Sequence, residues 1–268
     1  MRSKSLWFAE GVTDYYAFLH SYRSNYWDAD HLFGNLNYLV EELSGSKTRF
    51  QKTLEEACME TWEHGGFGVG DLDYYTKGAL VGLILDASIR KETEGKKSLD
   101  DVMRLMYQTY RLPNPGFRED GIQKAIDTVV GKPLPDPLRE CVQLKSELPY
   151  FRLSGIGLRV RLPGGNYASI GFEYEADTVT FVEPEGASLG IAVNDRILRV
   201  AGQPYVAGAF SKGPGERGYV IDFDRGGNKF QVIAPIIEKP VTRTRLEFDP
   251  FASAEQIRLR EQWLARKS

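Results

Sequence analysis

The chain has few of the residues from which metal and disulfide sites are built. Its 268 residues include three histidines and two cysteines: His20, His31, His64, Cys58 and Cys141. No two histidines have the four-residue spacing that places two imidazoles on one helix face, and the cysteines form no Cys-x-x-Cys pair. A catalytic zinc normally takes three protein ligands. A complete zinc site cannot be written from these residues, so we expect no metal on this chain alone.

Long apolar runs and a strong net charge are also lacking. No run approaches the roughly 20 apolar residues that cross a bilayer, so no membrane span is predicted. A formal net charge of −3 gives no electrostatic reason to expect a nucleic-acid partner. The first residues do not have the pattern of a signal peptide. We therefore expect a soluble protein of bacterial cytoplasmic or periplasmic type, and the compartment stays open.

The first 148 residues have helical patterns. The segment 71–90 is apolar around most of a helical circumference, which predicts a buried helix. The glycine-rich stretch 65–70 indicates a loop, and no Gly-Lys-Ser/Thr follows it to make a phosphate cradle. We expect an all-α bundle with helices, in chain order, over residues 28–43, 53–62, 71–90, 98–107, 119–130 and 135–145.

After residue 149 the apolar period changes toward two, which indicates strands. We expect an α + β multidomain chain: a helical domain over residues 1–148, a β-rich domain over 149–240, and a strand and helix over 241–268. The residues Arg225 to Asn228 predict a hairpin loop. The expected strands are residues 156–162, 178–182, 196–200, 219–223, 229–234 and 242–248, before a helix over 253–263.

Four segments of the helical half occur in an order that is typical of one family. They are Trp-Phe-Ala-Glu-Gly at residues 7–11, Leu-Glu-Glu-Ala ending in tryptophan at 54–62, Tyr-Tyr-Thr-Lys-Gly at 74–78, and residues 98–104. Together they resemble the glycyl-aminopeptidase family of zinc metallopeptidases, gluzincins related to the aminopeptidase N group. The resemblance implies the C-terminal half of a thermolysin-like catalytic domain.

The resemblance assigns roles to two residues. It implies that Glu10 is the glutamate zinc ligand and that Tyr75 stabilises the oxyanion of a tetrahedral intermediate, as a phenol can. The His-Glu-x-x-His segment, with its general-base glutamate, has no counterpart, so zinc belongs to the complete enzyme and this chain is expected to be inactive alone. The plainer alternatives are that Glu10 is a surface glutamate and that Tyr75 is a core tyrosine. For Asp14, four residues after Glu10, the plain interpretation is a solvated acid.

The second half resembles a PDZ domain, the domain that follows the catalytic domain in this family. Residues 169–172 look like the Gly-Leu-Gly-Phe loop, and residues 186–198 follow the PDZ run toward its Ile-Leu strand. The resemblance implies that Ile170, Gly171 and Phe172 capture a peptide C-terminus, with the peptide added to the sheet edge. Ser169 and Asn194 stand where the pattern has glycine, which leaves a fold that only packs on its neighbour as an alternative.

These observations favour the C-terminal portion of a zinc-dependent aminopeptidase that cleaves peptides with N-terminal glycine or alanine. The N-terminal half of the catalytic domain is then expected upstream or on another polypeptide. The alternative is a non-catalytic, peptide-binding protein of PDZ type. In a third hypothesis a separate chain supplies the histidines. The helical half would then expose an apolar patch, through which the chain could also self-associate.

Overall fold

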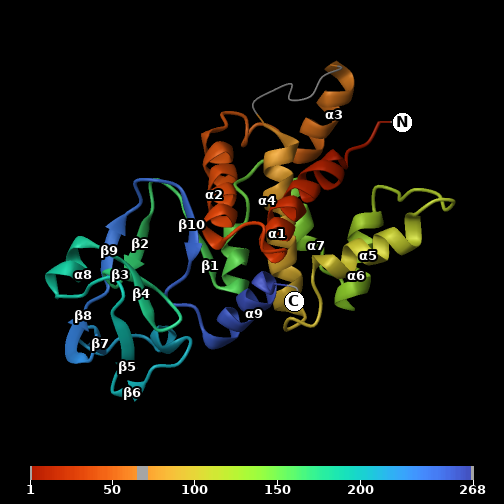
Figure 1. Ribbon diagram of the computed structural model, residues 1–268. Coiled ribbons are helices and arrows are strands. Elements are labelled where there is room, and N and C mark those ends of the chain that lie inside the picture. The colour runs from red at the N-terminus through yellow and green to blue at the C-terminus, as the bar shows by residue number, and fades with distance from the viewer. Residues whose placement is uncertain (1, 65–71, 267–268) are drawn as a thin grey trace. The chain divides into compact units, whose positions relative to one another are not determined.

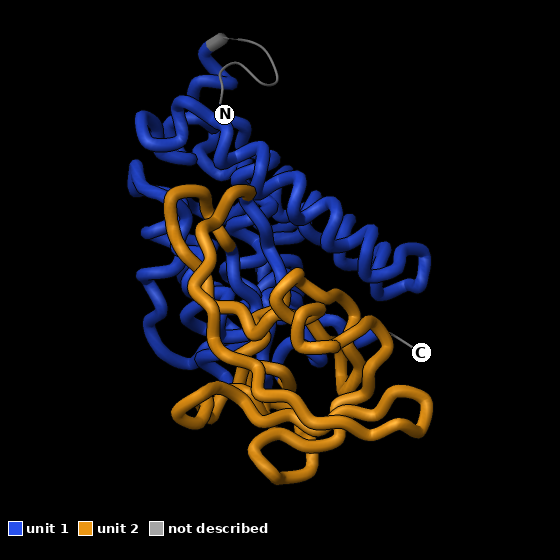
Figure 2. The backbone as a smooth tube through the Cα atoms, turned by 90° about the vertical axis from the view of Figure 1, so that its left-hand side faces the viewer, with its two compact units in different colours: residues 1–160, 244–247, 259–268 blue, residues 161–243, 248–258 orange. Residues whose placement is uncertain are grey.

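The computed structural model describes residues 2–64 and 72–266, and the chain divides into two compact units, coloured separately in Figure 2. Unit 1 comprises residues 1–160, 244–247 and 259–268, and unit 2 comprises residues 161–243 and 248–258. Helices and antiparallel strands are both present, which confirms the α + β class. The predicted loop at 65–70 lies outside the described residues. None of the described helices has the length and apolar character that a bilayer crossing requires.

Unit 1 is helical, and helix α4 lies at its centre (Figure 1). This helix is buried along nearly its whole length, as its continuous apolar sequence predicts. The helical elements are η1 (Trp7–Gly11), α1 (Val12–Arg23), α2 (Ala29–Gly45), α3 (Leu54–His64), α4 (Tyr74–Glu92), α5 (Leu99–Tyr110), α6 (Gly121–Val130), α7 (Pro135–Val142), η2 (Tyr150–Ile156) and α9 (Ala254–Leu264), whose last residues belong to unit 1.

Capping residues stand at the ends of several predicted helices. Asp28 caps α2 through its side chain, and Thr53 and Glu56 form the reciprocal bonds of a capping box at α3. Ser98 begins α5 with a second capping box. Gly131 ends α6 with a left-handed φ of +80°, a conformation that glycine adopts without steric cost.

The chain passes between the units through short elements. The expected strand over 156–162 is shorter, because residues 150–156 form the 3₁₀ helix η2 and only β1 (Leu158–Arg161) is extended. Strand β1 pairs with β10 (Arg245–Phe248) in a two-stranded sheet.

Unit 2 is built on an antiparallel sheet in the order β3-β4-β5-β7-β8, with β6 beside β5 and a separate β2-β9 pair. Strands β4, β5, β7 and β8 were predicted, whereas the four-residue strands β2, β3 and β9 were not. The elements are β2 (Asn166–Ser169), β3 (Phe172–Glu175), β4 (Thr178–Val182), α8 (Pro184–Ser188), β5 (Arg196–Val200), β6 (Gln203–Pro204), η3 (Ala209–Lys212), β7 (Tyr219–Arg225), β8 (Asn228–Ala234) and β9 (Ile237–Pro240).

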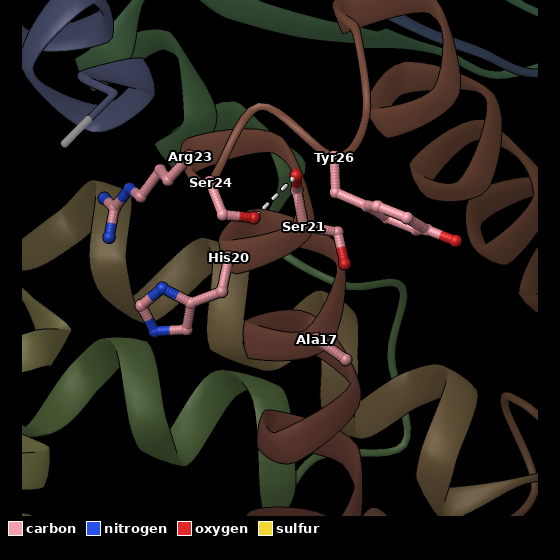
Figure 3. A pocket seen from close by; sticks show the side chains of 6 residues that line it. All are labelled: Ala17, His20, Ser21, Arg23, Ser24 and Tyr26. Carbon is pink, nitrogen blue, oxygen red and sulfur yellow. Dashed lines mark hydrogen bonds between the residues drawn. The ribbon is translucent and has the colours of Figure 1, made fainter. Parts of the chain in front are cut away.

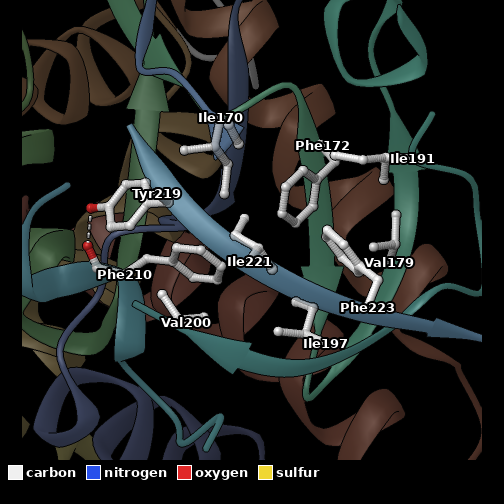
Figure 4. Packing of buried hydrophobic residues seen from close by; sticks show 11 residues of the cluster. Ile170, Phe172, Val179, Ile191, Ile197, Val200, Phe210, Tyr219, Ile221 and Phe223 are labelled. Atoms are coloured by element: carbon white, nitrogen blue, oxygen red, sulfur yellow. Dashed lines mark hydrogen bonds between the residues drawn. The ribbon is translucent and has the colours of Figure 1, made fainter. Parts of the chain in front are cut away.

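An aromatic cluster forms the core of unit 2 (Figure 4). The ring of Phe172 on β3 packs edge-on against Phe223 of β7, with centroids 5.7 Å apart, and against Phe210 of η3 at 6.2 Å. Edge-to-face pairs of this kind are favourable for aromatic rings. Ile170 is 1% exposed in the same cluster, so the core fixes both side chains that flank Gly171.

Candidate functional site

The first motif and the third motif meet where two helices cross without side chains between them. A Cβ on Gly11 would lie 2.5 Å from the Cα of Gly78, and one on Gly78 would lie 2.6 Å from the carbonyl oxygen of Trp7. Only glycine permits such a close backbone approach. The glycines of the two motifs therefore bring the first turn of α4 against the turn that carries Glu10.

Glu10 lies in a π-helical turn. Element η1 has this wider hydrogen-bonding pattern and continues directly into α1. Single π turns within helices occur frequently at functional sites. At its start, the Sγ of the buried Cys58 accepts a hydrogen bond from the Trp7 N–H at 3.4 Å, and burial raises the pKa of this thiol to about 11. Cys58 thus anchors the segment as a neutral thiol.

Tyr75 lies in the first turn of α4, which Asp73 caps. The Asp73 carboxylate accepts from the N–H of Tyr75 at 2.9 Å and from the hydroxyl of Thr76 at 3.2 Å. Asp73 at the N-cap is a favoured arrangement. The cap fixes the backbone from which the Tyr75 ring projects, and the ring of Tyr74 packs beside it with centroids 4.9 Å apart.

The structure places Tyr75 close enough to Glu10 for the charge of this carboxylate to act on the phenol. The pKa of Tyr75 is raised to about 12 by burial first, and then by the negative charge of Glu10, by Tyr74 and by the bond to Glu10. An anion beside a phenol disfavours the phenolate. Tyr75 is therefore protonated at neutral pH and serves as a hydrogen-bond donor, which is the form that an oxyanion requires.

Two further groups at this place were not recognised as site residues from sequence. Asp14 is half-buried, and its pKa is raised by burial and by the charges of Asp73 and Glu10. The phenol of Tyr74 also has a raised pKa, chiefly from burial. The signal for Asp14 was its position four residues after Glu10 on one helix face, but this spacing alone does not separate a buried acid from a solvated one.

The described residues do not provide a metal site. Within residues 2–64 and 72–266, no three His, Cys, Asp or Glu side chains gather closely enough to hold an ion. His20 stacks on Tyr16 at 5.3 Å, and His31 contacts Asp28 at 2.7 Å. Among the described residues Glu10 therefore lacks two further ligands beside it, whereas catalytic zinc takes three protein ligands. The described donors do not by themselves fit a catalytic zinc.

A surface pocket lies at the other end of α1 (Figure 3). Its volume is about 730 Å³, and it includes neither Glu10 nor Tyr75. The guanidinium of Arg23 in its wall is already bound to the carbonyl oxygen of Trp263 and to Asp100. Because the buried guanidinium of Arg23 already has these partners, the pocket is a weaker candidate for a functional site than the residues around Glu10. Its lining residues are Ala17, His20, Ser21, Arg23, Ser24 and Tyr26.

The loop that resembles a carboxylate-binding loop joins β2 to β3 in unit 2. Gly171 has a φ of +85° and packs against α8, where a Cβ on Gly186 would lie 2.1 Å from the Gly171 carbonyl oxygen. The side chains of Ile170 and Phe172 are buried. Strand β3 follows directly and is an end strand in the order of its sheet. The loop is therefore a rigid turn beside an edge strand.

Comparison with known proteins finds a family similarity in the first segment of the chain. The sequence model of the M61 glycyl aminopeptidases matches residues 1–81. Residues 1–81 are thus similar to M61 glycyl aminopeptidases. This confirms the resemblance drawn from the motifs, three of which lie inside the matched residues. The M61 match includes the residues at the helix crossing, which are Glu10, Gly11, Tyr75 and Gly78.

The fold of the whole chain also has a solved relative. A crystal structure of an aminopeptidase N family protein from Idiomarina loihiensis matches 98% of this chain and 49% of that protein, with a TM-score of 0.57 and 19% sequence identity. The chain thus spans about half the length of that protein. At 19% sequence identity the match shows a similar fold and carries no conclusion about activity. No curated protein matches the chain.

Proposed function

We propose that this chain is the C-terminal portion of an M61-type aminopeptidase and that it contributes Glu10 and Tyr75 to the active site of the complete enzyme. The observation that supports the proposal is the glycine-to-glycine crossing at Gly11 and Gly78, which brings the turn that carries Glu10 against the turn that carries Tyr75. The complete enzyme would hydrolyse peptides from their N-terminus and favour glycine or alanine there.

In this proposal each residue has a limited role. Tyr75 donates a hydrogen bond to negative charge that develops on the scissile carbonyl oxygen, a contact that gains strength in the transition state. Glu10 holds the phenol in place until substrate enters. Asp14 and Asp73 add negative charge around the pair. The two histidine ligands of zinc and the general base would come from groups outside these residues, upstream or on another polypeptide, and Glu10 would be the glutamate ligand that the resemblance implies.

Hydrolysis of glycyl and alanyl chromogenic substrates, measured with zinc content, tests the proposal. The chain alone is expected to show neither activity nor one bound zinc. When mixed with a polypeptide that carries the His-Glu-x-x-His half of an M61 enzyme, it is expected to gain both. In that mixture Tyr75→Phe should lower kcat about 100-fold, within the range for losing one oxyanion donor. Tyr38→Phe, at a 63% exposed tyrosine, is the matched control. Turnover by the chain alone would contradict the proposal.

A second candidate function concerns unit 2. The rigid turn at Gly171 and the adjoining end strand β3 favour a PDZ-like module that takes an extended peptide along β3, in the manner of strand addition. This function is tested by titrating the chain with a blocked peptide of alternating valine and lysine. Binding is followed through the NMR signals of the β3 amides. Perturbation limited to signals outside β3 and its loop would contradict it.

A further inference from the structure

The loop between β2 and β3 already has a hydrogen-bond acceptor on its central amide. The N–H of Gly171 donates to the Oγ of Ser169 at 2.9 Å, and both residues are buried. In a turn of this kind, backbone N–H groups form the binding place for an anion. Because Ser169 accepts from the middle N–H, a carboxylate that enters the loop has to displace the serine hydroxyl first.

The serine hydroxyl is itself fixed by a carboxylate. Its proton is donated to the Oε2 of Glu183, which also binds the Nζ of Lys239 at 3.0 Å. The hydroxyl of Tyr167 donates to the other oxygen of Glu183 at 3.2 Å. Strand pairing sets this arrangement, since Tyr167 on β2 lies opposite Lys239 on β9. Displacing Ser169 would therefore leave a buried carboxylate short of a donor, which is costly.

The charge beside the loop also opposes an anion. Burial raises the pKa of Glu183, but the bonds from Ser169 and Lys239 outweigh it and hold this pKa below the usual value. Glu185 binds the same ammonium at 2.5 Å, so two carboxylates share one lysine. Like charges in a partly buried place repel strongly.

We propose that Ser169 is a specificity-determining residue that closes this loop to free carboxylates, so that unit 2 selects extended peptide segments without a C-terminal carboxylate. Glu183 and Lys239 act through Ser169 as positioning residues. The proposal rests on the second candidate function for the choice of peptide class, whereas the closure of the loop depends only on the contacts of Ser169.

The test compares the full chain with Ser169→Ala by NMR of the Ile170, Gly171 and Phe172 amides. N-acetylvaline supplies a free carboxylate, and N-acetylvalinamide is its neutral counterpart. Wild type is expected to respond to neither, and S169A is expected to show a saturable shift with N-acetylvaline alone. Amide exchange at Gly171 should be about tenfold faster in S169A, since one hydrogen bond is lost. Ser188→Ala, whose hydroxyl bonds only within its own turn, should behave as wild type.

Two results would overturn the proposal: a wild-type response to N-acetylvaline as large as that of S169A, or equal Gly171 exchange in the two proteins. Glu183→Gln provides a second variant that keeps the side-chain shape, and it should respond to N-acetylvaline more than wild type and less than S169A. Binding of the blocked valine–lysine peptide is scored separately. If that peptide fails to bind while S169A gains the carboxylate response, the peptide-binding function fails and the role of Ser169 stands.

Discussion

At the scale of single residues, the contact between Tyr75 and Glu10 connects the site to a measurable property. The phenol has a pKa of about 12 because partial burial and the negative charge of Glu10 both disfavour the phenolate. A tyrosine that only filled the core would show the effect of burial without the dependence on Glu10. The charge of one neighbouring side chain thus separates the two interpretations of Tyr75 that the sequence left open.

Replacing Glu10 by glutamine should therefore lower the pKa of Tyr75 from about 12 toward its ordinary value of 10. The neutral amide removes the negative charge that disfavours the phenolate. The measurement is an NMR titration of labelled tyrosine rings, with the Tyr75 signal assigned through Tyr75→Phe. Glu41→Gln, at an exposed position of α2, should leave the titration unchanged. The same Tyr75 pKa in wild type and E10Q would refute the contact.

At the scale of elements, the sequence was a good guide wherever the signal was local. Caps such as Thr53 and Ser98 predicted helix starts because their partners lie three residues away. The crossing of η1 with α4 was not predictable in this way, since Gly11 and Gly78 meet across 67 residues. The four-residue strands β2 and β3 were missed because so short a segment carries no clear period.

One departure from the family pattern is explained by the backbone. Asn194 stands where the PDZ pattern has glycine, and its φ is +71°. Asparagine is one of the few side chains that adopt this conformation readily. The following Asp195 is fully buried and binds Arg225 at 2.6 Å. This departure therefore preserves the turn. The other departure, Ser169, accepts a hydrogen bond from the Gly171 N–H of its loop.

Two glycine-to-alanine substitutions, one at the helix crossing and one away from it, should have opposite effects on the stability of unit 1. Gly78→Ala should destabilise unit 1 by about 1–3 kcal/mol, the usual cost of overpacking, because the new methyl group would clash with the Trp7 backbone. Gly34→Ala in α2 has no atom within 4 Å of its Cβ and should stabilise by roughly 0.5–1 kcal/mol. Urea unfolding followed by helical circular dichroism measures both. A G78A protein as stable as G34A would show that the helices are not in close contact there.

At the scale of the whole molecule, residues from both ends of the chain form one buried network in unit 1. The indole N–H of Trp263 donates to the hydroxyl of Tyr15 at 2.8 Å, which donates to Asp86 at 2.7 Å. The side chain of Arg23 donates to the Trp263 carbonyl oxygen. Trp263 is fully buried, so the end of α9 is an integral part of the helical unit.

Trp263→Ala should therefore cost unit 1 about 3–5 kcal/mol, as is typical of large-to-small changes in a core. Trp62→Ala, at a 41% exposed tryptophan, should cost far less. Amide exchange distinguishes the units, and faster exchange in α4 with unchanged exchange in β7 is expected. Equal acceleration in both units would indicate that Trp263 stabilises the chain as a single cooperative body.

The same contact sets an order of events during synthesis. Tyr15 and Trp263 are separated by 248 residues, so a ribosome that adds about 5–20 residues per second needs roughly 10–50 s to make the second after the first. Throughout that interval the helical unit lacks the side chain of Trp263, and unit 2, residues 161–243 and 248–258, is synthesised within the same interval. The sequence of unit 2 is thus complete before the core of unit 1 can close around Trp263.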